Sequence, residues 1–297
     1  MTSPRPTAPA RMGAGGATRG ARRWRPAVVG ALLVLATMTA WAIAPQLATS
    51  ANPIRGRLGE NFRPVVGLPG GSRAHLLGTD SVGRDVLARI VYGARPSLLV
   101  GSAAVVLAGL LGSTAGLLAG YLGRGWDLVL MGMADIQLGL PFLLLAITLA
   151  AVVGPGLGTA ILALVLTGWV PYARLARAEL LSLRARPFVQ AARAVGASSA
   201  RVMLRHVLPN LGPTLVVVAM FSFAQMIIME SALSFLGLGI QPPRPSWGSM
   251  LSDARSYLVT AWWAGVFPGV AIVATMLAVN VVGEELRERL DPKLRGF

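Results

Sequence analysis

Six long apolar stretches divide this chain of 297 residues. A helix that crosses a lipid bilayer needs about 20 mostly apolar residues, and five of the stretches reach that length, while the fourth is shorter. Hydrophobic residues make up 54% of the chain and charged residues 13%, a balance that suits a surface facing lipid. The sequence therefore predicts an all-α membrane protein with six transmembrane helices. The stretches are residues 26–47, 97–122, 128–153, 157–172, 213–233 and 261–282.

Glycine and proline residues indicate how these helices pack and bend. The second stretch carries glycines three or four residues apart, which lets a neighbouring helix approach closely. Pro141 predicts an interruption in the third stretch, and Gly154-Pro155-Gly156 predicts a tight turn before the fourth. The glycines are Gly109, Gly112, Gly116 and Gly120.

The positive charges are distributed unevenly between the two sides of the predicted bundle. With a cytoplasmic N-terminus, 18 of the 27 lysines and arginines fall on the cytoplasmic side and nine on the other. Because short cytoplasmic loops carry such an excess, we expect both termini inside. The net charge of +15 would suggest a nucleic-acid partner for a soluble protein. Here the arginines cluster beside apolar runs and fix orientation, so no nucleic-acid role is expected.

We divide the chain into a tail, a first span with an outer segment, a core and a second tail. The first apolar run reaches spanning length and predicts an uncleaved anchor, with a secretory signal cleaved near Ala48-Thr49-Ser50 as the alternative. The segments are a disordered basic cytoplasmic tail (1–25), the first transmembrane helix with an extracytoplasmic segment (26–96), a five-helix core (97–284) with a cytoplasmic loop (173–212), and a cytoplasmic C-terminal tail (285–297).

Several kinds of chemistry are absent from the sequence. There is no cysteine, and the only histidines are His75 and His206, without the spacing of a zinc helix. No G-x-x-x-x-G-K-[ST] phosphate loop occurs, so the chain lacks the loop that usually binds the phosphates of ATP. No nucleophile and base are paired in a recognisable way. We therefore expect no cofactor, no metal and no catalysis here, and we expect His75 to be a solvated loop residue.

A polar insert, QAARAVGASSARVMLRHVLPN, lies at residues 190–210 between two apolar stretches. Pro187 and Pro209 bracket it and Gly196 divides it, which predicts two short helices that meet at a glycine turn. Ser198 or Ser199 can cap the second helix. The pattern fits an amphipathic helix on lipid headgroups and a helix that docks on a partner equally well.

The insert resembles the cytoplasmic EAA loop of the membrane subunits of binding-protein-dependent ABC importers. Gln190-Ala191-Ala192, Gly196 and Val207-Leu208-Pro209 carry the resemblance, with Gln190 where glutamate is common and Val207 where isoleucine is common. The resemblance implies a type I importer-like bundle whose coupling helix docks in a groove of a cytoplasmic ATPase. The implied coupling residues are Gln190, Ala191, Ala192, Gly196, His206, Leu208 and Pro209.

Two further stretches narrow the resemblance. Residues 75–101 and 230–251 are similar to segments of one membrane subunit of dipeptide, oligopeptide and nickel importers, with Ala88 and Pro96 as mild departures. This implies a multi-pass permease subunit of a bacterial inner membrane that forms half of a pathway for di- or oligopeptides. The implied partners are a homologous second permease, two cytoplasmic ATPase subunits that bind ATP and Mg, and an extracytoplasmic solute-binding protein. A stand-alone secondary transporter or channel, or an importer of nickel or another non-peptide solute, is the alternative.

The two outer segments have plausible structural roles. Residues 78–85 combine a glycine turn with acidic and basic side chains, which suits helix capping or pairing, and contact with a solute-delivering protein is the alternative. Residues 234–245 are too broken by glycine and proline to span again, and we expect a re-entrant element covered by protein.

Polar residues inside the spans are candidates for function because their burial in lipid is costly. They would line the pathway or a subunit interface, or they would hydrogen-bond between helices. These residues are Asp135, Gln137, Gln225 and Glu230.

Overall fold

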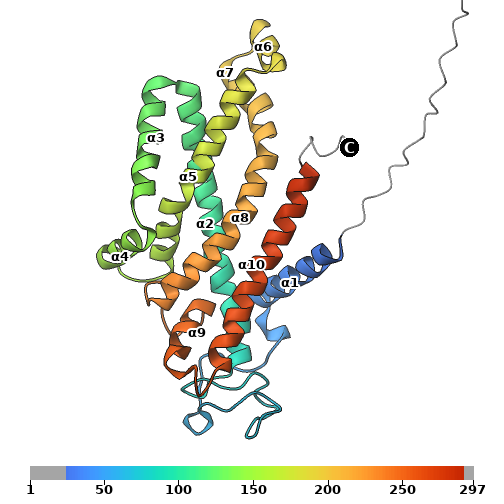
Figure 1. The fold of residues 1–297 in the computed structure, drawn as a ribbon, viewed down its shortest axis with the longest axis vertical. Coiled ribbons are helices and arrows are strands. Elements are labelled where there is room, and N and C mark those ends of the chain that lie inside the picture. The colour runs from blue at the N-terminus through green and yellow to red at the C-terminus, as the bar shows by residue number, and fades with distance from the viewer. Residues whose placement is uncertain (1–24, 291–297) are drawn as a thin grey trace, which may run out of the picture.

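A computed structural model describes residues 25–290 as a bundle of helices, with no β-strand in that range beyond one isolated bridge between Thr79 and Asp85. The long helices run between two ends of the bundle (Figure 1). One end carries the short helix α6 (Pro187–Ala194) and the other carries α9 (Trp247–Ala254). We refer to these as the α6 end and the α9 end.

Within residues 25–290, five helices are long and apolar enough to cross a membrane, and a sixth crossing exists if two helices joined by a sharp bend count as one. The five are α1 (Pro26–Ile43), α2 (Val86–Leu122), α5 (Leu157–Arg184), α8 (Leu208–Phe235) and α10 (Trp263–Leu290). The bent pair is α3 (Arg124–Gly139) and α4 (Phe142–Val153). Shorter elements are 3₁₀ turns at Pro45–Leu47, Leu58–Glu60 and Arg255–Tyr257, helix α7 (Ser199–Val202) and a π-helical turn at Met203–Val207. The predicted all-α class is confirmed.

Several helices, among them α2, α5 and α10, extend beyond the apolar stretches that predicted them. Helix α2 begins at Val86 rather than near residue 97, because the Asp85 carboxylate accepts a hydrogen bond from the Ala88 N–H at 2.7 Å and caps the helix there. Helix α5 continues past Pro171 to Arg184, and α10 reaches Leu290, inside the predicted C-terminal tail. Residues 1–24 and 291–297 of the two predicted tails lie outside the described residues.

Pro141 interrupts the third stretch, residues 128–153, as predicted, and divides it into two helices. Leu140 has extended backbone angles and is followed by Pro141, which disfavours the helical conformation of the residue before it. Helix α3 therefore ends at Gly139, and α4 departs at an angle of 94°.

The predicted close approach along the glycine-rich second stretch is confirmed in the packing of α2 on α5. A Cβ atom at Gly112 would lie 2.1 Å from the Trp169 carbonyl oxygen, and one at Gly116 would lie 2.1 Å from that of Ala173. The two backbones therefore touch where α2 has no side chains.

The core at the α9 end is built around two tryptophans. Trp247 is fully buried, and its indole N–H donates to the Ile90 carbonyl oxygen at 3.0 Å. The Trp263 indole N–H donates to the Thr79 carbonyl oxygen, also at 3.0 Å. After α8 the chain turns at Gly237, where φ is +78°, and α9 packs against α2, α8 and α10. This agrees with an element that turns back into the protein instead of spanning again.

Candidate functional site

The polar insert forms the α6 end of the molecule (Figure 1). Two short helices meeting at Gly196, as predicted, are present as α6 and α7. The second does not stop at Pro209: α7 passes through the π-helical turn directly into α8. The Leu208 N–H bonds to the Met203 carbonyl oxygen across this wider turn, immediately before the proline that lacks an N–H. The part of the insert that follows Gly196 is therefore continuous with α8 as one helix.

Gly196 ends α6 in a left-handed conformation, with φ at +83°. The Ala197 N–H donates to the Ala192 carbonyl oxygen at 3.0 Å, and the Val195 N–H donates to that of Ala191 at 3.1 Å. The first of these bonds is the 6→1 hydrogen bond of a Schellman motif. This motif needs a residue in the left-handed conformation, which glycine adopts at low cost in free energy. A methyl group added at Gly196 would meet no other atom within 4 Å, so backbone conformation alone selects glycine here.

Gln190 closes the junction between α5 and α6. Its amide nitrogen donates to the Ala185 carbonyl oxygen at 3.3 Å, at the end of α5. A glutamate at this position would have no hydrogen to donate when ionised. The departure from the family pattern thus satisfies a carbonyl of the helix end in this chain.

Ser198 and Asn210 each make a side-chain hydrogen bond to the backbone of the second helix. The Ser198 hydroxyl oxygen accepts a hydrogen bond from the Arg201 N–H at 3.4 Å, which confirms Ser198 as the cap. The Asn210 amide donates to the His206 carbonyl oxygen at 2.6 Å, and the His206 ring meets the Phe188 ring edge to face at 6.0 Å. His206 thus packs between α6 and the helix that follows.

The base of the insert is held by an apolar cluster and one arginine. Residues of α5, α6, α7 and the π-helical turn bury their side chains together. The Arg184 guanidinium donates to the Gly120 carbonyl oxygen at 2.7 Å and lies over the Tyr121 ring, so α5 is tied to the end of α2. The sequence pattern did not identify Arg184, because its acceptor is 64 residues away. The cluster is Leu180, Leu183, Val189, Val202 and Val207.

The outer surface of the insert is left uncovered. Gln190, Ala191, Gly196, Leu208 and Pro209 are exposed, while Ala192 and His206 are half-buried. Apolar side chains accompany them on this surface: Val195 is 85% exposed and Phe188 is 43% exposed. Apolar groups gathered on a protruding, well-anchored element are typical of a contact surface. All seven predicted coupling residues thus lie at one end of the molecule.

The polar residues predicted inside the spans do not gather at one place. Asp135 of α3 pairs with Arg174 of α5 at 2.6 Å, and both side chains are more than half exposed. A second pair, Asp127 with Arg177, joins the same two helices and is less exposed. Gln137 is half-buried on α3.

On α8, Gln225 is exposed and Glu230 is fully buried towards the α9 end. The Ser234 hydroxyl donates to the Glu230 carboxylate at 2.8 Å, and the Ser97 hydroxyl of α2 is a further donor. The backbone N–H of Trp247 donates to the Ser97 hydroxyl oxygen at 3.3 Å. The Glu230 carboxyl thus connects α2, α8 and α9, which accounts for its burial through hydrogen bonds between elements.

Ion pairs at the α9 end join the segment before α2 to α9. Arg89 contacts both Asp80 and Asp253, and Arg84 contacts the same two carboxylates. Burial would raise the pKa of Asp80. The two guanidiniums and the N–H groups of Val82 and Arg84 outweigh that effect and hold the pKa of Asp80 below its ordinary value. The predicted capping and pairing roles of residues 78–85 are confirmed.

His75 is not the solvated loop residue that was expected. Its side chain is only 15% exposed and lies between two carboxylates. The Nδ1 atom is 2.8 Å from Asp85, and the Nε2 atom is 3.1 Å from Glu60. The loop before α2 folds back over the helix start and brings these three residues together.

The described residues contain no cluster of three or more metal-ligating side chains. Comparison with known proteins then gives the family. A family model described as "Binding-protein-dependent transport system inner membrane component" matches residues 112–296. The chain belongs to this family.

Relatives of this inner membrane component are similar over 80% or more of their length. The chain is 46% identical to the dipeptide transport system permease protein DppC of Escherichia coli K12 over 279 residues, which cover 92% of this chain and 91% of the relative. It is 44% identical to the di/tripeptide transport system permease protein DppC of Pseudomonas aeruginosa over 241 residues, with 80% of each chain covered. A dipeptide transport system permease protein of Alkalihalophilus pseudofirmus is 40% identical over 269 residues, with 91% and 86% covered.

Solved structures of more distant sequence share the fold. A chain of the MetNI methionine ABC transporter in an inward-facing conformation superposes with a TM-score of 0.53 at 17% identity, covering 67% of this chain and 96% of that one. A chain of an amino acid ABC transporter crystallised with histidines gives 0.54 at 16% identity, covering 68% and 94%. The inner membrane component therefore has the helical bundle of ABC importer permeases.

Proposed function

We propose that this inner membrane component is the permease subunit of an ABC importer for di- or oligopeptides. It forms half of a translocation pathway in the bacterial inner membrane, with a homologous second permease forming the other half. Its membership in the family and its similarity to dipeptide permeases support this function. The chain itself binds no ATP or Mg and breaks no bond.

The structural observation that carries the proposal is the α6 end. Helix α6 is exposed, its termination depends on a left-handed glycine, and its base is anchored to α2 and α5. A helix held in this way transmits a displacement by a bound partner protein to the helices of the bundle, without bending where it joins α5. We assign α6 as the coupling helix that docks in a groove of a cytoplasmic ATPase subunit.

The proposed coupling role implies an orientation and a set of partners. The α6 end and both termini lie in the cytoplasm, where two ATPase subunits bind ATP and Mg. The α9 end faces the opposite side and receives solute from an extracytoplasmic binding protein. Closure of the ATPases on nucleotide shifts the permeases between inward-open and outward-open states, because each state binds its partners with different affinity.

Replacement of Gly196 tests the coupling role. Gly196→Val places a β-branched residue in the left-handed region, which disfavours the end of α6 by about 1–2 kcal/mol. We expect the assembled transporter to insert in membranes but to hydrolyse ATP without matching peptide uptake. Gly196→Asn, which tolerates this conformation better, should retain part of the uptake.

Gly132→Val is the matched control, since Gly132 lies within helix α3 and also has open space around it. It should leave coupling unchanged. Uptake and solute-stimulated ATP hydrolysis are measured on the same proteoliposomes. Normal coupling in Gly196→Val, or solute transport by the chain alone without an ATPase, would refute the proposal. The substrate class is tested by binding assays on the associated solute-binding protein, where selective capture of nickel chelates instead of peptides contradicts it.

A further inference from the structure

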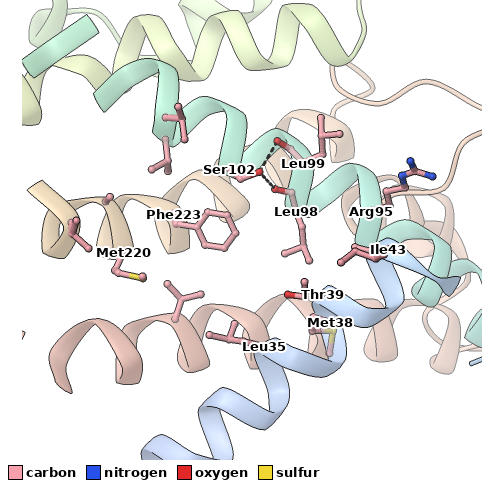
Figure 2. A pocket seen from close by; sticks show the side chains of 16 residues that line it. Leu35, Met38, Thr39, Ile43, Arg95, Leu98, Leu99, Ser102, Met220 and Phe223 are labelled. Carbon is pink, nitrogen blue, oxygen red and sulfur yellow. Dashed lines mark hydrogen bonds between the residues drawn. The ribbon is translucent and has the colours of Figure 1, made fainter. Parts of the chain in front are cut away.

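A groove with a volume of about 650 Å³ runs between α1, α2, α8 and α10 (Figure 2). Its walls are mostly aliphatic and aromatic side chains from all four helices. Leu35 and Met38 of α1 face Met220 and Phe223 of α8 across it, and Arg95 and Ile43 lie together at one end (Figure 2). That end is the one nearer α9, because Arg95 belongs to the first part of α2.

The Ser102 hydroxyl, which lies in the groove, needs no partner from a ligand. The Ser102 hydroxyl donates back to the carbonyl oxygens of Leu98 and Leu99, at 2.8 Å and 3.1 Å (Figure 2). Such a bond within the helix leaves no hydroxyl hydrogen for the groove. The wall is therefore suited to an alkyl chain rather than to a polar solute.

A second hollow, of about 730 Å³, continues from the first. Both are lined by Arg95 and Leu99. The second hollow adds Arg244, from the loop between α8 and α9, and Tyr92. Its remaining polar lining comes from Ser50 and Asn52, which follow α1. The pair of hollows thus has an apolar part and a cationic part.

Arg95 and Arg244 have no carboxylate partner among residues 25–290. Arg84 and Arg89, at the same end of the bundle, are paired with Asp80 and Asp253. Arg95 and Arg244 are both exposed, and no hydrogen bond or ion pair holds either guanidinium within that range. Two unneutralised guanidiniums that line one hollow favour a ligand with a negatively charged oxygen group.

We propose that these two hollows bind one anionic phospholipid from the leaflet at the α9 end. Its phosphate lies between Arg95 and Arg244, and one acyl chain occupies the groove between α1 and α8. The cationic hollow lies at the end of the apolar part of α2, and the apolar groove adjoins it. This arrangement matches an amphiphile with an anionic head group. The bound lipid fills the space between α1 and α8. This inference does not depend on the transported solute.

Lipid retention by the purified full-length chain, and by the assembled transporter, tests the head-group contacts. After reconstitution in equal parts of phosphatidylglycerol and phosphatidylethanolamine and extraction in mild detergent, intact-protein mass spectrometry should find one retained phosphatidylglycerol. Arg95→Gln with Arg244→Gln should lower that retention by about tenfold. Arg73→Gln, which removes an exposed arginine at the same end that lines neither hollow, should leave it unchanged. Equal retention of the two lipids, or no effect of the double replacement, overturns the proposal.

Filling the groove tests the acyl-chain contacts separately. Ser102→Phe should abolish retention while both arginines remain. Thr114→Phe is the matched control, because Thr114 is also an exposed hydroxyl residue of α2 that bonds back to its own helix, and it does not line the groove. A phospholipid with a photoreactive acyl chain, used on the unmodified protein, should label α1, α2 and α8. Labelling confined to other helices, or a protein segment cross-linked in the groove of the assembled transporter, overturns the proposal even if a variant fails to fold.

Discussion

Gly196 and Gly116 would both be disturbed by a larger residue, for different physical reasons. Gly196 has a left-handed backbone and open space around it, so only its conformation matters. Gly116 lies in a regular helix, but an added methyl group would lie 2.1 Å from the Ala173 carbonyl oxygen. The first glycine shapes a surface element, and the second sets the distance between two spanning helices.

We expect Gly116→Ala to destabilise the bundle by about 2 kcal/mol, because the Ala173 backbone cannot move away without separating α2 from α5. Gly109→Ala is the control on the same helix, since its methyl group would meet only the Tyr172 ring, at 3.4 Å. The apparent unfolding temperature in detergent distinguishes the two. Equal shifts would contradict the close approach of the helices at Gly116.

Asp80→Asn should destabilise the α9 end by about 2 kcal/mol at neutral pH, because it leaves the buried Arg89 guanidinium with only the partly exposed Asp253 carboxylate as its partner. The pKa of Asp80 in the folded protein lies below its ordinary value of 3.8. Its stabilising contribution is therefore complete above that value and is lost as the pH falls through the folded pKa.

Unfolding of the wild-type protein and of Asp80→Asn as a function of pH checks this dependence. The difference between them should be constant near neutral pH and should narrow only in acid below about pH 4. A difference that already closes between pH 5 and pH 7 would assign the effect to another group.

Residue contacts were the part of the structure least predictable from sequence. His75 meets Glu60 and Asp85 from 15 and 10 residues away, and Arg184 meets Gly120 from 64 residues away. No local spacing marks such partners, because a loop or a pair of crossing helices brings them together. The cap at Ser198 and the glycine turn at Gly196 were predictable, since both depend on bonds within a few residues.

At the scale of elements, two ion pairs tie α3 to α5, and they differ in exposure. Asp127 and Arg177 are about one-third exposed, whereas Asp135 and Arg174 are more than half exposed. Water or headgroups screen the more exposed pair. The attachment of α3 should therefore depend mainly on Asp127 and Arg177.

Double-mutant cycles measure this difference. Replacing Asp127 and Arg177 by alanine, singly and together, should give a coupling free energy of about 1 kcal/mol in unfolding. The same cycle on Asp135 and Arg174 should give less than about 0.5 kcal/mol. The reverse order would show that the second pair is covered in the assembled protein.

The elements themselves were largely predictable, because apolar length is a property of the chain alone. The bend between α3 and α4 was only partly predictable from the sequence. Pro141 marked an interruption, but the angle of 94° depends on how α4 packs against its neighbours. The extension of α5 beyond residue 172 was missed because its last turns are arginine-rich and leave the apolar window.

For the whole molecule, the proposed orientation can be tested with single cysteines, because the natural chain has none. Val195 at the α6 end is 85% exposed and Val259 near α9 is 97% exposed. In intact cells or right-side-out vesicles, a membrane-impermeant maleimide should label Val259→Cys at once. It should label Val195→Cys only after the membrane is opened. The opposite pattern would place the α6 end outside and exclude cytoplasmic coupling.

One continuous helix connects the two ends of this molecule. From Ser199 through the π-helical turn to Phe235 it runs for roughly 55 Å at 1.5 Å per residue. Its first turns adjoin α6, and its last turns carry Glu230, whose carboxyl accepts a hydrogen bond from Ser97 of α2. If α6 is driven by an ATPase as proposed, an axial displacement at the α6 end is delivered to the α9 end through this one helix, which contains the π-helical turn and Pro213.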